Sequence, residues 1–319
     1  MLNIKIVNII GIILFFLGFS MIPSSLWSLA YSSSYTLNDS EFLDFIAILK
    51  SSIITIVFGL FFYFSTLYYR NKNNVELRAR DGFVIVTAGW ILISIFSALP
   101  FYLSSSGLSI TNSFFEAMSG LTTTGATILG SNIGQTPEIE ELSKGLLFWR
   151  SFTQFIGGMG IIVFSIAILP LLGVGGVQLF RAEVAGPVAE KITPRVKQTA
   201  KLLWGIYVGL VLLQTLILKF EGMSWFDSLC HSFTTIATSG FSTKNASIAA
   251  FNSPLIEYTI IFFMFLAATS FSLHYLFLAK HKFDYFKDEE FRVYFLILCL
   301  VSIILFLDIN FNGIYKWQL

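Results

Sequence analysis

Two stretches rich in hydroxyl groups and glycine carry the chemistry that this sequence offers. The segment NSFFEAMSGLTTTGAT at 112–127 aligns without gaps on DSLCHSFTTIATSGFS at 227–242, so the two copies lie 115 positions apart. The alignment pairs Gly125 with Gly240. Each copy predicts a short apolar helix that is followed by a polar turn around one glycine. Backbone carbonyl oxygens presented by such a turn can replace the water shell of a cation.

The ligands that these turns offer are neutral oxygens. We expect 122–125 and 237–240 to return in extended form and to present carbonyl groups. Glycine suits this role because aligned carbonyl groups require backbone angles that a side chain disfavours. Neither turn contains Asp or Glu, the residues that a pore for divalent cations would need. The sequence therefore favours a monovalent cation.

A short helix must position each turn. The predicted helices cover about 112–121 and 227–236, and they begin at Asn112 and Asp227, which suit the N-cap position. If the helices run inward, their C-terminal ends carry the negative pole of the helix dipole and favour a cation. A segment that enters the membrane and returns is tolerated only where protein or water covers its backbone. The pattern is therefore typical of a pore loop.

The composition indicates a membrane protein. Of the 319 residues, 55% are apolar and 12% are charged, which excludes an ordinary soluble globular chain. We expect an all-α polytopic membrane protein with helix–pore-loop–helix repeats, preceded by an N-terminal helix pair. Pro23 is expected to kink the first span. Seven stretches are long and apolar enough to cross a bilayer: about 6–30, 45–69, 83–103, 146–172, 202–218, 255–278 and 291–307.

Charge placement predicts the orientation of these spans. Most of the twenty basic residues follow the second, fourth and sixth spans, whereas the opposite loops are acidic or neutral. By the positive-inside rule the N-terminus is cytoplasmic and both turns open outward. The alternative is that the turns are merely capped polar loops. Two copies at one register, each flanked by spans on the same membrane side, favour pore loops over that alternative.

The 115-residue shift also relates the flanking spans, which predicts a division of the chain into repeats. We expect an N-terminal helix pair at 1–80, a first helix–pore-loop–helix unit with its connector at 81–197, a second unit at 198–290, and the first helix of a third unit at 291–319.

Four residues near the turns could have either a structural or a functional role. Glu116 and His231 occupy equivalent places in the short helices, and we expect them to brace the turns rather than bind the ion. Arg150 and Trp149, near the outer end of the fourth span, are interpreted as interface anchors.

Small residues in the same span also have two readings. Gly157, Gly158 and Gly160 either let this helix pack tightly behind a pore loop or make ordinary helix contacts, and we favour the second.

Several other functions find no support. The net charge of +1 gives no sign of nucleic-acid binding. Cys230 and Cys299 lie far apart, and the three histidines lack the spacing of metal ligands. Titratable groups inside the predicted membrane region are isolated rather than convergent, so an enzyme is not expected.

Four segments of the sequence together form a specific pattern: FFEAMSGLTTTGAT at 114–127, WRSFTQFIGGMGIIVFSIAILPLLGVGGVQLFRAE at 149–183, ITPRVKQTAKLLWGIY at 192–207 and CHSFTTIATSGFSTKNASI at 230–248. These segments resemble the Trk/Ktr potassium-uptake family, with the membrane subunit of the bacterial Trk system as the nearest type. The resemblance implies potassium uptake across the bacterial cytoplasmic (inner) membrane, with potassium as the transported ion, a homodimer, and a cytosolic nucleotide-binding regulatory subunit.

The resemblance also implies site residues. Within the filter, the expected carbonyl ligands of potassium are Thr123, Thr124, Thr238 and Ser239. The full set of implied filter residues is Thr122, Thr123, Thr124, Gly125, Ala237, Thr238, Ser239 and Gly240. Glycine at both filter positions resembles the potassium-selective type.

The family has four filter segments, and this chain holds two of them. An alternative function is therefore a truncated, non-conducting half-transporter that acts only as an assembly partner.

Overall fold

The computed structural model is built from α-helices. It describes residues 4–70, 79–130, 136–168 and 196–311, and these residues include no β-strand. The chain separates into two compact units, Met1–Ala267 and Ala268–Leu319, which are described one at a time. The all-α fold expected from the sequence is confirmed. The repeat boundaries expected at 80, 197 and 290 stay predictions.

Three helices make the N-terminal part of the first unit: α1 (Ile4–Ser20), α2 (Ile22–Tyr31) and α3 (Ser40–Arg70). The first predicted span is interrupted at Met21, and Pro23 stands in the first turn of α2. Proline there costs nothing, because the first helical amides lack intrahelical partners. The expected effect of Pro23 on this span is confirmed.

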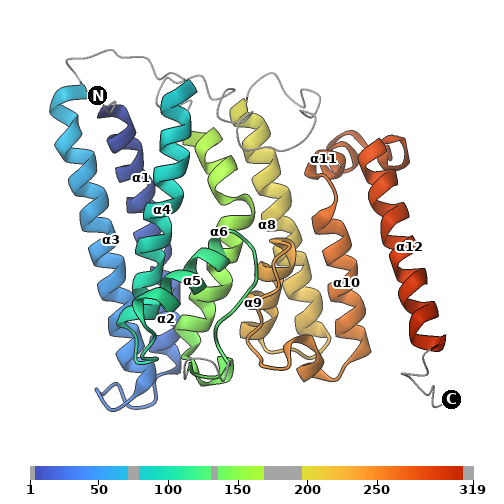
Figure 1. Ribbon diagram of the computed structural model, residues 1–319, viewed down its shortest axis with the longest axis horizontal. Helices are drawn as coiled ribbons and strands as arrows, with labels where there is room; N and C mark the ends of the chain where they lie inside the picture. Colours follow the sequence, from blue (N-terminus) through green and yellow to red (C-terminus); the bar gives the residue numbers. More distant parts are fainter. Residues whose placement is uncertain (1–3, 71–78, 131–135, 169–195, 312–319) are drawn as a thin grey trace. The chain divides into compact units, whose positions relative to one another are not determined.

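Helices α1 and α3 lie against each other along their length (Figure 1). A Cβ atom added to Gly59 would lie 2.6 Å from the Phe15 amide nitrogen and 2.8 Å from the Gly11 carbonyl oxygen. Asn8 Nδ2 also donates to Thr66 Oγ1 at 2.8 Å. Small residues let the two backbones approach, and a buried polar pair adds a directional contact, as is common between helices in membranes.

The two predicted repeats follow as matching sets of helices. The first contains α4 (Ala79–Leu103), α5 (Ile110–Leu121) and α6 (Lys144–Ile168). The second contains α8 (Val196–Phe220), α9 (Trp225–Ile236) and α10 (Pro254–Ala268). Short 3-10 turns at Ile139–Glu141 and Ser247–Phe251 lie in the connections that follow α5 and α9. In Figure 1 the short helices α5 and α9 reach only partway into the bundle of long helices.

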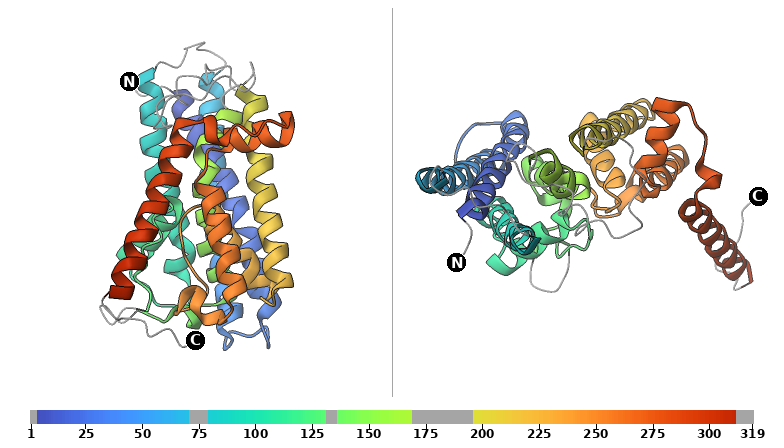
Figure 2. Two further views of the ribbon diagram at one scale, coloured as in Figure 1. Left: turned by 90° about the vertical axis from the view of Figure 1, so that its right-hand side faces the viewer. Right: turned by 90° about the horizontal axis from the view of Figure 1, so that it is seen from above.

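Helix α6 is the central element of the first unit. It contacts α5 of its own repeat and α8 and α9 of the next. Seen from above, it lies between the α1–α5 group and the α8–α9 pair (Figure 2). A helix in this position can hold parts of both repeats at once.

Five helices in the described part of the chain are long and apolar enough to span a membrane: Ile4–Tyr31, Ser40–Thr66, Phe83–Leu103, Lys201–Phe220 and Glu289–Ile309. The fourth expected span, 146–172, coincides with α6 as far as Ile168 and then leaves the described residues. The sixth, 255–278, is wrong as one helix: α10 ends at Ala268 and α11 (Phe271–Lys280) begins after Thr269 and Ser270. Hydroxyl side chains can bond to nearby backbone groups, which weakens a helix at such a point.

The second unit contains α11, a 3-10 turn at Tyr285–Lys287, and α12 (Glu289–Phe311). His274 Nδ1 lies 2.9 Å from the Tyr285 hydroxyl, and the Tyr285 ring contacts the rings of Phe283 and Phe291. This aromatic cluster fixes the start of α12 against α11.

Candidate functional site

The N-cap of each short helix lies three residues before the predicted N-cap. The Ser109 hydroxyl accepts from the Asn112 amide at 3.2 Å, and the Ser224 hydroxyl accepts from the Asp227 amide at 3.0 Å. The N-caps are therefore Ser109 and Ser224, and the predicted caps Asn112 and Asp227 are wrong, since both residues lie inside the first turn. A serine three residues before Asn or Asp is the signal that identifies them.

Asp227 has a different role from the one expected. Its Oδ1 atom accepts from the Thr243 hydroxyl at 2.6 Å, and Oδ2 accepts from the Ser224 hydroxyl at 2.6 Å. The carboxylate thus ties the start of α9 to the segment that returns after the filter turn.

Both short helices end in the same backbone motif. The amides of Thr123 and Thr124 donate to the Gly120 and Ser119 carbonyls at 3.0 and 2.9 Å. The second copy repeats this pattern, with the Thr238 and Ser239 amides donating to the Thr235 and Thr234 carbonyls at 3.0 Å each. These paired bonds define a Schellman motif, which satisfies carbonyl groups that a helix end leaves free.

The motif corrects the predicted course of the turns. Thr122 and Ala237 have φ of −82° and −74° with ψ near zero, so they close the helices instead of extending away from them. Thr123 and Thr238 follow at φ of +53° and +54°, the left-handed region. The extended return expected over 122–125 and 237–240 is therefore wrong for the first two residues of each segment, and Gly125 and Gly240 also have positive φ, of +74° and +116°.

The two turns meet each other. A Cβ atom on Gly125, which has φ of +74°, would lie 2.6 Å from the Ser239 carbonyl oxygen. Gly240 has φ of +116°, and a Cβ there would meet nothing within 4 Å. Glycine at 125 is thus required by both conformation and a neighbouring backbone, whereas glycine at 240 is required by conformation alone.

One face of α6 holds the ends of both short helices. A Cβ atom on Gly157 would collide with the Leu121 carbonyl of α5, and one on Gly158 would lie 3.0 Å from Ala237 Cα after α9. The reading of these glycines as ordinary helix contacts is therefore wrong. Because Gly157 and Gly158 have no side chains, α6 can contact the end of α5 at the first glycine and the end of α9 at the second. The surroundings of Gly160 lie outside what the structure describes.

Equivalent residues brace the two returning segments, as expected for Glu116 and His231. The Thr127 hydroxyl donates to Glu116 Oε1 at 2.9 Å, and the Ile128 amide donates to Oε2 at 3.2 Å. In the second copy, His231 Nε2 lies 3.0 Å from the Ser242 hydroxyl. His231 Nδ1 lies 2.8 Å from the Asp227 carbonyl, which can only accept, so this nitrogen carries the hydrogen.

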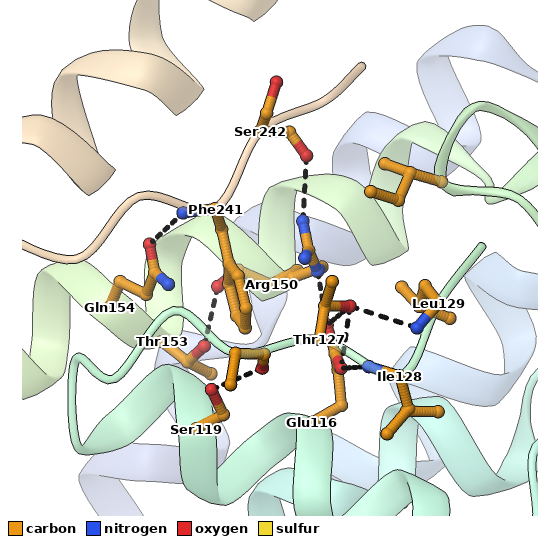
Figure 3. Close-up of polar contacts among 12 residues, drawn as sticks. Glu116, Ser119, Thr127, Ile128, Leu129, Arg150, Thr153, Gln154, Phe241 and Ser242 are labelled. Atoms are coloured by element: carbon orange, nitrogen blue, oxygen red, sulfur yellow. Dashed lines mark hydrogen bonds and ion pairs between the residues drawn. The ribbon is translucent and has the colours of Figure 1, made fainter. Parts of the chain in front are cut away.

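Arg150 and Trp149 are not interface anchors. Both are buried, at 1% and 0% exposure. Trp149 Nε1 donates to the Ser97 carbonyl at 3.0 Å. Arg150 Nε forms an ion pair with Glu116 Oε1 at 2.5 Å, and Nη1 donates to the Ser242 carbonyl at 2.8 Å (Figure 3).

Two more contacts complete this arrangement. The Arg150 guanidinium stacks on the Phe241 ring, with Cζ 3.6 Å from its centroid. One helical turn further along α6, Gln154 Oε1 accepts from the Phe241 amide at 3.3 Å (Figure 3). The signal for Arg150 was its charge inside an apolar span, because such a charge needs a partner within the protein. Gln154 gave no comparable signal.

The eight predicted filter residues thus lie in two turns that begin with the same Schellman motif and approach each other at Gly125 and Ser239. The oxygens available there are backbone carbonyls and the hydroxyls of threonine and serine. Thr122, Thr124 and Gly240 are exposed, whereas Ala237 is buried. Ion binding at Thr123, Thr124, Thr238 and Ser239 stays a prediction.

Comparisons with known proteins point to one family. The sequence profile of the TrkH family, described as cation transport protein, matches residues 46–315. The Trk system potassium uptake protein TrkH of Vibrio parahaemolyticus is 39% identical over 309 residues, which are 95% of this chain and 59% of the relative. The protein of the same name from Escherichia coli K12 is 44% identical over 256 residues, 79% of this chain and 52% of the relative.

A solved structure gives the same result. The crystal structure of the potassium transporter TrkH from Vibrio parahaemolyticus aligns with a TM-score of 0.80 at 34% sequence identity. The alignment covers 99% of this chain and 61% of that chain. The chain thus spans between half and two thirds of the length of the proteins it matches.

Proposed function

This chain belongs to the TrkH family of cation transport proteins, and from that premise we propose that it forms part of a potassium-uptake pathway across the bacterial cytoplasmic membrane. The transported ion is potassium, and the path is lined by backbone carbonyl groups of the two filter turns. Thr123, Thr124, Thr238 and Ser239 supply the ligands. The proposal contains no enzymatic step.

One observation carries this proposal: the turns after α5 and α9 begin with the same Schellman motif and approach each other at Gly125 and Ser239. Two turns with one backbone form can present equivalent oxygens to one ion. The C-terminal ends of both helices lie at these turns, and their partial negative charge stabilises a cation without a carboxylate. Exchange of the ion's water shell for carbonyl oxygens then gives selectivity by geometry and dipole strength.

The proposal includes surroundings and partners. The five membrane-length helices support a multi-pass protein in the lipid bilayer. The excess of basic residues after the second, fourth and sixth expected spans supports a cytoplasmic N-terminus. A homodimer and a cytosolic nucleotide-binding regulatory subunit complete the proposal, on the family resemblance.

A second candidate function is an assembly partner that does not conduct by itself. The observation that favours it is that the described residues contain two filter turns, whereas the family resemblance implies four. Two filter turns then form only part of a closed path.

Rubidium uptake separates the two functions. The chain is expressed in bacteria that lack their own potassium-uptake systems, and its amount in the membrane is measured beside the uptake. Uptake above the empty-vector level supports the pathway. No uptake from a well-inserted protein contradicts the pathway for this chain and leaves the assembly partner.

A further inference from the structure

We propose that Arg150 is a positioning residue that holds both filter turns at once, so that neither turn can move without the other. The inference deepens the proposed function and rests on it for the meaning of the turns as a filter. The contacts themselves stand on the described residues alone. They concern the returning segments behind the filter, not the ion ligands.

The guanidinium reaches both repeats. Its Nε atom contacts Glu116 in the first repeat, and its Nη1 atom donates to the Ser242 carbonyl in the second. Its flat face lies on the Phe241 ring, which directly follows Gly240. Arg150 thus touches the segment that follows the second turn by a hydrogen bond and by stacking, and reaches the segment that follows the first turn through one carboxylate.

Glu116 passes the position of Arg150 on to the first turn. Its two carboxylate oxygens accept from the Thr127 hydroxyl and the Ile128 amide as well as from Arg150. Figure 3 shows these groups converging between the two chain segments. A shift of Arg150 would therefore move the carboxylate and, with it, the segment that leaves Gly125.

Burial prevents the contact from opening. The Arg150 and Glu116 side chains have relative exposures of 2% and 0%, so neither charge can exchange its partner for water. An exposed ion pair is weak and mobile, but a buried one is costly to separate because each charge is left without its opposite charge in a site that water does not reach. This is the property that a fixed strut requires.

Helix α10 of the second repeat, which covers Pro254–Ala268, contains no basic residue that could act as such a strut. Because α10 begins 110 positions after α6, the apolar Ile260 stands at the place of Arg150, and under the 115-residue shift of the short helices His231 stands in place of Glu116. The uncharged contact between His231 and the Ser242 hydroxyl holds one atom of the second segment, and Arg150 holds the neighbouring carbonyl. One residue of the first repeat therefore completes the support of both.

Hydrogen exchange of the full chain in lipid nanodiscs tests this coupling. In Arg150→Lys the charge is kept, but lysine lacks the planar fork that reaches two acceptors and stacks on a ring. We expect faster amide exchange in both 122–130 and 237–246, by about tenfold or more, and no change in 4–31. Tenfold corresponds to about 1.4 kcal/mol of opening free energy.

Two further variants keep the test decisive. Glu116→Gln with Arg150→Gln removes both charges together, leaves no uncompensated charge, and is expected to loosen both segments in a folded protein. Lys244→Gln is the matched control, because it removes a positive charge from the same region at a partly exposed pair with Glu140. It is expected to leave exchange in 122–130 unchanged. Loosening confined to one segment, or wild-type exchange in both Arg150 variants, would overturn the proposal.

Ion preference is the second readout and separates this inference from the proposed function. If the wild-type chain takes up rubidium, Arg150→Lys should lower the rubidium-to-sodium uptake ratio at equal membrane content, and an unchanged ratio would contradict the inference. If the wild-type chain takes up no rubidium, the proposed function fails for this chain. The exchange experiment still decides whether Arg150 couples the two turns.

Discussion

Thr123 and Thr238 adopt a backbone conformation that β-branched residues ordinarily avoid. Both have φ just above +50° at the position that glycine usually fills in a Schellman motif. A strained backbone conformation persists only where the surrounding contacts hold it in place, and residues with such strain are common at functional sites. The same strain at equivalent positions of two repeats supports a filter role for both threonines.

Replacing this threonine by glycine should stabilise the protein while harming the filter. In Thr123→Gly, relief of the left-handed strain of about 1–2 kcal/mol exceeds the entropic cost of glycine, about 0.5–1 kcal/mol. We expect a higher unfolding temperature in detergent. Thr122→Gly is the control, since Thr122 has negative φ and should lose stability. A lower unfolding temperature for Thr123→Gly than for wild type would show that the positive φ of Thr123 does not strain the protein.

Gly125 and Gly240 should respond differently to the same side chain. Serine at either position meets the left-handed penalty of about 1–2 kcal/mol, but only Gly125→Ser also meets the Ser239 carbonyl. We expect Gly125→Ser to unfold at a lower temperature than Gly240→Ser and, in a conducting form, to admit sodium more readily. Equal unfolding temperatures and an unchanged sodium-to-rubidium ratio would exclude the contact with Ser239 as the cause.

Asp39 makes stability depend on pH at the loop between α2 and α3. Desolvation raises its pKa, but hydrogen bonds from the Ser34 amide, the Ser32 hydroxyl and the Ser33 and Glu41 amides outweigh this and lower the pKa from 3.8 to about 2. Because the folded pKa is depressed, the stabilisation is present above pH 3.8 and is lost as the pH falls toward 2. Asp39→Asn should therefore be less stable than wild type at pH 7, and the difference should vanish near pH 2.

At the scale of elements, the α1–α3 contact depends on backbone approach. Gly59→Ala would place a methyl group 2.6 Å from the Phe15 amide nitrogen, so the helices must separate. We expect a loss of about 1–3 kcal/mol, the usual cost of overpacking. Gly89→Ala, on α4, is the matched control, because its added Cβ meets nothing within 4 Å. Thermal unfolding of both variants measures the difference, and equal losses would contradict the close approach of α1 and α3.

The elements also show what the sequence could predict. The short helices, their matching turns and the bracing role of Glu116 and His231 followed from local patterns repeated at one register. The serine N-caps carried a local signal too, since Ser109 and Ser224 are also 115 positions apart. The partners of Arg150 carried none, because Glu116 and Ser242 lie 34 and 92 positions away and only packing brings them to α6.

At the scale of the whole molecule, membrane orientation is the property on which the direction of transport depends. Basic residues gather after alternate expected spans, and both filter turns follow helices that begin at the opposite loops, which are acidic or neutral. Because basic loops tend to stay on the cytoplasmic side during insertion, these loops predict the orientation of the helices between them.

Thiol labelling of intact cells tests this orientation. Ala246→Cys lies in the exposed segment after the second filter turn, and Lys282→Cys lies in the basic segment after α11. A membrane-impermeant reagent should label Ala246→Cys in intact cells and Lys282→Cys only after permeabilisation, while wild type with Cys230 buried gives the background. The reverse pattern would contradict the predicted orientation, in which both turns open outward, and with it the direction of transport in the proposed function.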